Sequence, residues 1–222
     1  MTGPIVVVHG EAHREVPPEQ AVFSVVVSAA DRDRAVVLSR LSQRAAEIGT
    51  ILDRYGPAIE RRETAGVQVY PEFKRGGERV TSYAGSVATT VTATDFAALG
   101  MLLADIAARE SASVSGPWWQ LRRGSRAGAD VRREAVADAL DRAREYAAAV
   151  GSEIDRIVEI ADAEAGGAHP MMRGAFGAFG AAEAADAATG FDLFPQQQTV
   201  EARVLLRVTI TEPTVLGRGA PA

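Results

Sequence analysis

The sequence predicts an α+β protein in which three amphipathic helices pack against a mostly antiparallel sheet. Several runs alternate apolar and polar residues, which is typical of half-buried strands. Three other segments repeat apolar residues at spacings of three and four, which is typical of helices with one buried face. The predicted strands follow one another in pairs and alternate with helices only in part, which favours α+β over a doubly wound parallel sheet.

Two strands are expected at the amino terminus. Residues 5–8 are β-branched, and the alternation continues past Gly10 until Pro17 and Pro18 stop the strand. In residues 20–30, Phe23 and Val25 share one face with further apolar residues, while serines occupy the other.

Three helices follow from their caps and apolar stripes. Asp31 or Asp33 caps the first, whose stripe is Leu38, Leu41, Ala45, Ile48, Leu52 and Tyr55. Thr94 or Asp95 caps the second, whose stripe is Phe96, Leu99, Leu103 and Ile106. The third covers about residues 130–150, ends at Gly151, and has the stripe Val136, Leu140, Ala143, Ala147 and Val150.

The remaining strands lie between and after these helices. Residues 59–70 and 80–94 predict a hairpin that turns at the two glycines within residues 71–79. Residues 111–123 read as an extended segment, and residues 154–163 and 199–211 as two further strands.

The length of 222 residues allows one large domain or two small ones. We expect a single domain over residues 1–212, with two intimate subdomains, 1–110 and 111–212, as the alternative. Residues 164–198 are rich in Gly and Ala and predict a long mobile loop, because a compact domain seldom contains so long a segment without a regular element. We expect a disordered tail over residues 213–222.

Composition and motifs exclude several classes of chemistry. The chain has no cysteine, so disulfides, thiolate zinc sites and cysteine nucleophiles are excluded. It contains neither the serine nucleophile motif nor the glycine-rich nucleotide motifs. No catalytic residue and no cofactor is indicated, and we do not expect an enzyme.

A metal site is the second hypothesis from the residues themselves. If the first strand is unbroken, His9, Glu11 and His13 lie on one face, because alternate strand residues point the same way. Imidazole and carboxylate groups bind divalent cations such as zinc. One strand places about two of them on one ion, so a further ligand from elsewhere is needed. The alternative is a polar face exposed to solvent.

Single-stranded nucleic-acid binding is the third hypothesis. Trp118 and Trp119 stand close to several arginines in residues 118–133, and stacked aromatics beside positive charge are typical of such sites. Consecutive tryptophans on a strand point to opposite faces, however, and the net charge of −5 argues against a nucleic-acid partner. We expect one Trp in the core and one at a subunit interface, with Phe176 and Phe179 as further interface candidates.

The chain shows no targeting or membrane signal. Its first residues include no basic leader with an apolar stretch, and its longest weakly polar run, residues 21–30, is far shorter than a membrane span. As given, the sequence predicts a cytoplasmic protein, and the cell envelope is the alternative if a leader has been removed.

Four motifs, in order, resemble the SIMPL-domain family. These are a strand with Gly10 and Glu11, a Pro-Pro-Glu-Gln-Ala turn, an aromatic hairpin over residues 70–86, and an alanine-rich helix with a Gly stop and a strand over residues 139–160. The Gly- and Met-rich loop before a final strand is similar as well. The resemblance covers residues 5–212.

The resemblance implies an α+β domain that tends to form oligomers. It also implies bacterial relatives that are often periplasmic and linked to oxidative-stress defence, and a eukaryotic relative that associates with a signalling kinase. The family pattern supplies no catalytic residues, so none is assigned to this sequence. The leading hypothesis is a non-enzymatic, homo-oligomeric scaffold or stress-associated protein, whose partner is a second copy of itself or an unidentified protein.

Overall fold

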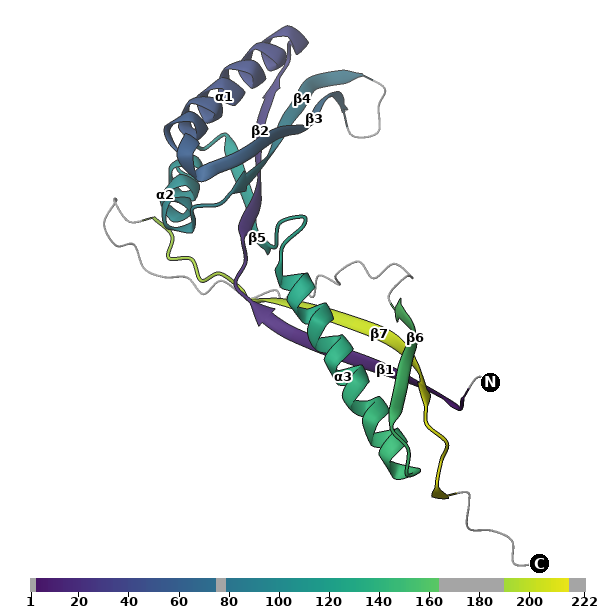
Figure 1. Ribbon diagram of the computed structural model, residues 1–222. Helices are drawn as coiled ribbons and strands as arrows, with labels where there is room; N and C mark the ends of the chain where they lie inside the picture. The colour runs from purple at the N-terminus through teal and green to yellow at the C-terminus, as the bar shows by residue number, and fades with distance from the viewer. Residues whose placement is uncertain (1–2, 75–78, 164–189, 216–222) are drawn as a thin grey trace, which may run out of the picture. The chain divides into compact units, whose positions relative to one another are not determined.

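The computed structural model describes residues 3–74, 79–163 and 190–215 (Figure 1). It confirms the α+β prediction and the predicted order of helices and strands. The elements are β1 (Ile5–Val16), β2 (Gln20–Asp31), α1 (Arg34–Arg54), the 3-10 turn η1 (Gly56–Ala58), β3 (Ile59–Phe73), β4 (Val80–Ala93), α2 (Phe96–Ala107), β5 (Ala112–Gln120), α3 (Ala127–Ala149), β6 (Ile154–Asp162) and β7 (Gln198–Ile210).

The strands form two separate sheets, and the chain divides into two units. The described residues of the four-stranded unit are 17–74, 79–122 and 190–198, and those of the three-stranded unit are 3–16, 123–163 and 199–215. This division differs from the alternative of two subdomains, 1–110 and 111–212, because β5 pairs with β2 and β1 lies beside β7. Local patterns predict strands well, but they do not encode which distant strands pair.

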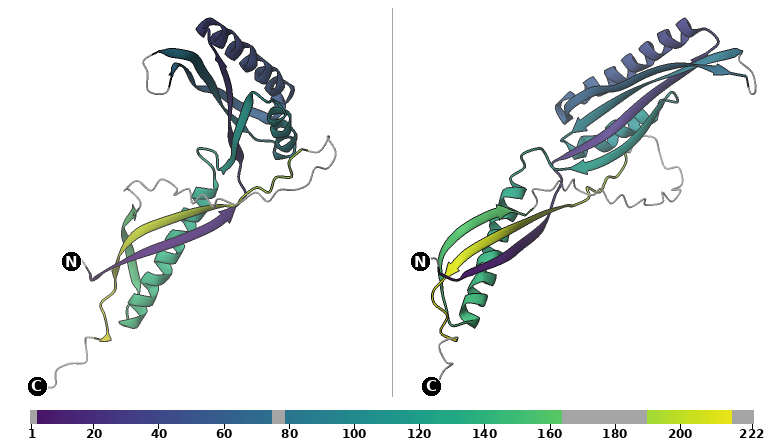
Figure 2. Two further views of the ribbon diagram at one scale, coloured as in Figure 1. Left: turned by 180° about the vertical axis from the view of Figure 1, so that it is seen from behind. Right: turned by 90° about the vertical axis from the view of Figure 1, so that its right-hand side faces the viewer.

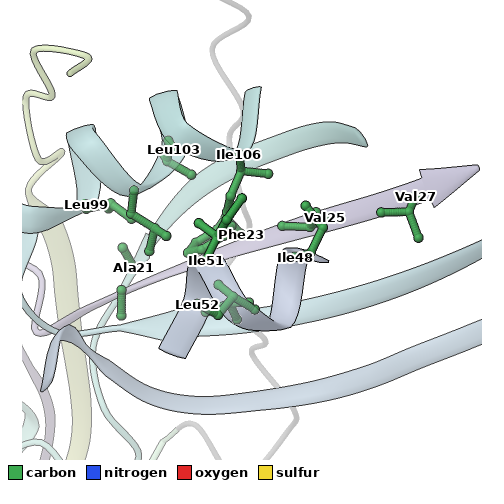
Figure 3. Packing of buried hydrophobic residues seen from close by; sticks show 13 residues of the cluster. Ala21, Phe23, Val25, Val27, Ile48, Ile51, Leu52, Leu99, Leu103 and Ile106 are labelled. Atoms are coloured by element: carbon green, nitrogen blue, oxygen red, sulfur yellow. The ribbon is translucent and has the colours of Figure 1, made fainter. Parts of the chain in front are cut away.

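The four-stranded unit has the strand order β3-β4-β2-β5, with each neighbouring pair antiparallel. Both helices of this unit, α1 and α2, pack on one face of the sheet (Figure 2). Phe23 of β2 is fully buried between them and marks the centre of this core (Figure 3). The other core residues include Ala21, Val25, Val27, Ile48, Ile51, Leu52, Leu99, Leu103 and Ile106.

The helix caps follow the sequence prediction. The Asp33 carboxylate accepts a hydrogen bond from the backbone N–H of Ala35 at 2.8 Å. The Asp95 carboxylate accepts from the N–H groups of Ala97 and Ala98 at 3.0 and 3.2 Å. Each carboxylate therefore satisfies first-turn N–H groups that have no partner within the helix.

The predicted stripe of α1 is wrong at its first position. Leu38 is exposed, and Val37 is buried instead, against Ala29 and Leu41. Val37 and Leu41 are four residues apart and therefore face the sheet together, whereas Leu38 is rotated by about 100° away from Val37. The sequence alone does not distinguish two adjacent apolar residues at the edge of a stripe.

Part of the segment predicted as a mobile loop packs on α2. Phe191 donates its backbone N–H to the carbonyl of Gly100 at 3.2 Å, and Leu193 packs against the core of the four-stranded unit. A Cβ at position 100 would lie 2.2 Å from the Phe191 carbonyl oxygen, so the close approach requires glycine there. The rest of that segment, residues 164–189, and residues 216–222 of the predicted tail lie outside the described residues.

The three-stranded unit has the order β1-β7-β6, and α3 packs against its sheet. The inward face of β7 is the one that the sequence predicts. Its residues Ala202, Val204, Leu206, Val208 and Ile210 are all buried.

A row of small side chains lets α3 lie close to the sheet. The helix buries Val131, Ala135, Ala139, Ala143 and Ala147, which are spaced by four. Each step of four turns about 40° beyond a full helical turn, so the row winds slowly around the helix. Gly10 of β1 lies under this row, because a Cβ there would be 2.1 Å from the Ala135 carbonyl oxygen. The predicted stripe residues Val136, Leu140 and Val150 are only partly buried.

Candidate functional site

The two sheets end in four outer strands, and three of these carry at least one feature that opposes pairing with another strand. In β1, the backbone N–H of Glu11 donates to the Asp138 carboxylate at 2.9 Å. In β5, Pro117 lacks an N–H group, and the pairing with β2 is irregular between Val22 and Ser24. Irregular register, proline and covered N–H groups are the usual means by which proteins protect a sheet edge.

The third protected strand is β6. Its register against β7 shifts twice, between Ile154 and Arg156 and between Ile157 and Glu159. Such bulges twist an edge away from a flat pairing geometry. The strand nevertheless exposes apolar side chains, with Ile157 and Ile160 about half exposed. It therefore combines a protected backbone with an apolar surface.

The fourth outer strand, β3, contains an unprotected stretch that we call the β3 edge segment, residues 66–70. Its register against β4 is regular, because shifts occur only before Gly66 and after Glu72. Residues 64–71 carry no charged side chain. Val67 is 61% exposed and Tyr70 is 52% exposed. A regular, uncharged and apolar outer strand is the feature that most favours addition of another strand.

The orientation of the backbone in this segment follows from Pro71. Pro71 lies opposite Tyr83 in the β3–β4 pairing. Proline within a sheet is placed so that its missing N–H faces the open edge. Because residues alternate, the N–H and C=O groups of Val67 and Val69 then face the open edge as well. The side chain of Val69 packs with Val37 and Leu41, which holds the segment in place from the helix side.

The chain protects the exposed end of β2 with arginines, which contrasts with β3. The pairing of β2 with β5 ends at Val27 and Ala112. Beyond that point, Arg44 donates to the Ser28 carbonyl, and Arg40 donates to the Ala30 carbonyl at 3.2 Å. A shallow groove lies here, lined also by Tyr70 and Glu110. The two guanidinium groups thus donate hydrogen bonds to β2 carbonyls beyond the point where the pairing with β5 ends.

The three predicted metal ligands lie on one face of β1, as the sequence indicates, and all three are exposed. The Glu11 carboxylate faces arginines, with Arg142 at 4.0 Å and Arg203 at 3.9 Å. In residues 3–74, 79–163 and 190–215, no group of three His, Asp or Glu side chains is placed to hold one ion. Nothing in the described part of the chain favours a metal at His9 or His13.

The tryptophans lie on opposite faces of β5. Trp119 is partly buried and packs against the core of the four-stranded unit, edge-to-face with Phe96 and with the two ring centroids 4.9 Å apart. Trp118 is exposed, at 37%. Trp119 is thus the inward-facing tryptophan of the pair, and Trp118 stays an interface candidate. Phe176 and Phe179 lie outside the described residues.

The arginines that suggested nucleic-acid binding are divided between the two units. Arg122 belongs to the four-stranded unit and forms an ion pair with Glu60 at 2.8 Å. Arg126, Arg132 and Arg133 belong to the three-stranded unit, where they line a shallow hollow beside Asp130 at the start of α3. Both tryptophans belong to the four-stranded unit, so the predicted cluster of tryptophans and arginines is divided between the units.

Among the described residues, two titratable groups have clearly shifted pKa values, and neither belongs to the β3 edge segment. The backbone N–H of Asp33 and the Arg40 guanidinium lower the pKa of Asp31, against a smaller opposing effect of desolvation. Desolvation raises the pKa of Tyr55, and its hydrogen bond to Asp105 at 2.9 Å adds to the shift. Both groups support α1 at its two ends, so their role is structural.

The β3 edge segment was not identified from the sequence. The available signals were the uncharged run of residues 64–71 and the proline that ends it. These signals indicate a pairing surface only if β3 is an outer strand, and that position depends on long-range pairing.

Among the described residues, no helix is long and apolar enough to span a membrane.

Comparisons with known proteins place this fold in a family without supplying an activity. A search of curated proteins gives no match. One solved structure that matches in part is a Burkholderia cenocepacia protein whose provisional description is amidohydrolase/peptidase. It is 14% identical, with a TM-score of 0.32, over 54% of this chain and 31% of that one. The match therefore spans about a third of that protein's length and carries no functional argument.

The model of the SIMPL family, described as proteins of unknown function, matches residues 6–208. Because the match extends from β1 to β7 and includes both sheets, the chain belongs to the SIMPL family.

Proposed function

We propose that this protein is a non-enzymatic scaffold that works by assembling with further copies of itself. The observation that carries the proposal is that each sheet ends in an outer strand with exposed apolar side chains, β3 in one unit and β6 in the other. Exposed apolar side chains on an outer strand are a liability in a monomer, because they favour uncontrolled contact with other chains. A defined assembly removes that liability by covering them.

The chemistry of these surfaces also supports association with protein. Val67 is apolar and 61% exposed, and it has no charged residue next to it on its strand face. Ile160 is also apolar and 52% exposed, but Asp162 lies next to it on the same face of β6. Burial of such side chains contributes about 25 cal/mol per Å² of apolar surface removed from water. This contribution depends little on ionic strength, unlike that of surface ion pairs.

Light scattering coupled to size exclusion tests the proposal on the untagged full-length chain. The expected result is a discrete multimer whose mass is the same in low and high salt, because apolar burial and backbone pairing hold it together. A mass equal to that of one chain, 23.4 kDa, at every protein concentration up to about 100 µM would contradict the scaffold function.

A further inference from the structure

We infer that the β3 edge segment is the contact between two copies of this chain, paired antiparallel about a two-fold axis at Gln68. The inference rests on the proposed self-assembly and names the surface and the partner. In this pairing, the four-stranded sheets of the two copies join edge to edge into one continuous sheet. Isologous contacts of this kind use the same residues on both subunits.

The sequence of the segment is self-complementary in this register. With Gln68 opposite its own copy, Val67 lies opposite Val69 of the second chain, and Gly66 lies opposite Tyr70. Pairs of β-branched residues are favourable across strands. An aromatic side chain opposite glycine covers the backbone that glycine leaves exposed. No pair in the segment brings like charges together, because residues 64–71 are uncharged.

The backbone orientation fits the same register. The N–H and C=O groups of Val67 and Val69 face the open edge, as Pro71 requires. Each Val67 then exchanges two hydrogen bonds with Val69 of the other chain, and Gln68 occupies a pair without hydrogen bonds. All the outward-facing backbone groups of residues 66–70 are satisfied by this arrangement.

The side chains extend an existing core across the contact. Val69 packs with Val37 and Leu41 on the helix side of the sheet. Val67 is on the same side but 61% exposed, because no helix covers it. In the pairing, Val67 of one copy lies beside Val69 of the other, so each covers the exposed surface of its counterpart. An unrelated extended peptide would not supply this match from both sides.

The Cys-free chain allows a direct test of the register. In a pair without hydrogen bonds the two Cα atoms are about 4.5 Å apart, which is within the range of a disulfide. The full-length Gln68→Cys variant is therefore expected to form a disulfide-linked dimer under mild oxidation. The matched control is Tyr70→Cys, whose two copies are about 13 Å apart in this register, so it is expected to stay uncross-linked.

A second variant tests the contact without a new covalent bond. Val67→Lys places a charge on the edge, which prevents strand pairing, while its exposure lets the fold tolerate the change. We expect the multimer to lose the contact, so that its mass falls by half or more. Leu38→Lys is the matched control, because Leu38 is an apolar residue of similar exposure on a helix, and its mass is expected to stay that of the wild type.

The outcomes separate this inference from the proposed function. A multimeric wild type with no Gln68→Cys dimer, or with equal cross-linking of Tyr70→Cys, overturns the β3 pairing and leaves self-assembly standing. A multimer whose mass is unchanged by Val67→Lys also overturns the β3 pairing while self-assembly stands, and it makes β6 the next strand to test. A wild type that is a monomer at every concentration overturns both.

Discussion

Tyr55 shows how a single side chain connects two helices. Its hydroxyl donates to the Asp105 carboxylate at 2.9 Å, and Arg54 approaches the same carboxylate at 3.3 Å. The three residues join the end of α1 to α2 inside the four-stranded unit. A part-buried hydrogen bond to a charged group contributes about 1.5–3 kcal/mol to stability. Tyr55 therefore contributes this hydrogen bond in addition to the apolar packing that the sequence predicts.

We predict that the stability of the protein falls in alkaline solution in part because of Tyr55. Its pKa is raised in the folded state, so the folded protein favours the neutral phenol. The contribution is fully present below the unfolded pKa of about 10 and is lost as the pH rises towards the folded value. The chain has four tyrosines and one lysine, so the Tyr55→Phe variant, and not the wild type alone, is needed to assign the effect to Tyr55.

Urea denaturation at pH 7 and pH 10.5 measures this effect. Tyr55→Phe is expected to lower the free energy of unfolding at pH 7 by about 1.5–3 kcal/mol and to reduce the loss of stability between the two pH values. An equal loss in the wild type and the variant would show that Tyr55 does not carry the pH dependence.

The packing of α3 on β1 belongs to the scale of elements. The row of alanines on the helix and Gly10 on the strand are complementary, since both lack the bulk that would separate the two elements. Sequence periodicity located the helix but favoured the larger residues Val136 and Leu140 as its buried face. It did so because size alone suggests burial, whereas the close approach at Gly10 selects small residues.

We predict that Gly10→Ala destabilises the three-stranded unit. The added Cβ would meet the Ala135 carbonyl oxygen at 2.1 Å and the Ala139 nitrogen at 2.5 Å, so the helix must move away. Overpacking of this kind costs about 1–3 kcal/mol. Thermal unfolding followed by circular dichroism measures the loss.

The matched control is Gly49→Ala in α1. A Cβ at Gly49 meets nothing within 4 Å, and alanine is the better helix former by about 0.5–1 kcal/mol. The two glycine substitutions are therefore expected to change stability in opposite directions. A neutral Gly10→Ala would mean that α3 does not pack as closely on β1 as the structure indicates.

The outer position of β3 in its sheet explains why the β3 edge segment was not predicted from the sequence. The pattern predicted a strand over residues 59–70 and placed Pro71 in the turn. In the structure, β3 continues through Pro71 to Phe73, which only an outer strand permits. An uncharged run such as residues 64–71 is ordinary in a central strand, which already has two partners, but in an outer strand it favours pairing with another chain.

At the scale of the whole molecule, local order was predictable and pairing was not. The α+β class, the order of the elements and the inward face of β7 follow from periodicity and caps. The division into two sheets depends on contacts between β1 and β7 and between β2 and β5, which lie far apart in the chain. The proposed self-assembly depends on that division, because the division determines which strands are outermost.

We propose that β3 is the strand through which copies of the chain join. Hydrogen exchange at the amides of Val67 and Val69 tests this most directly, since both groups face the open edge and have no partner in a single four-stranded unit. We predict that protection of these two amides rises with protein concentration and disappears in Val67→Lys. Rapid exchange of both amides at every concentration, in a protein that is otherwise folded, would contradict the account.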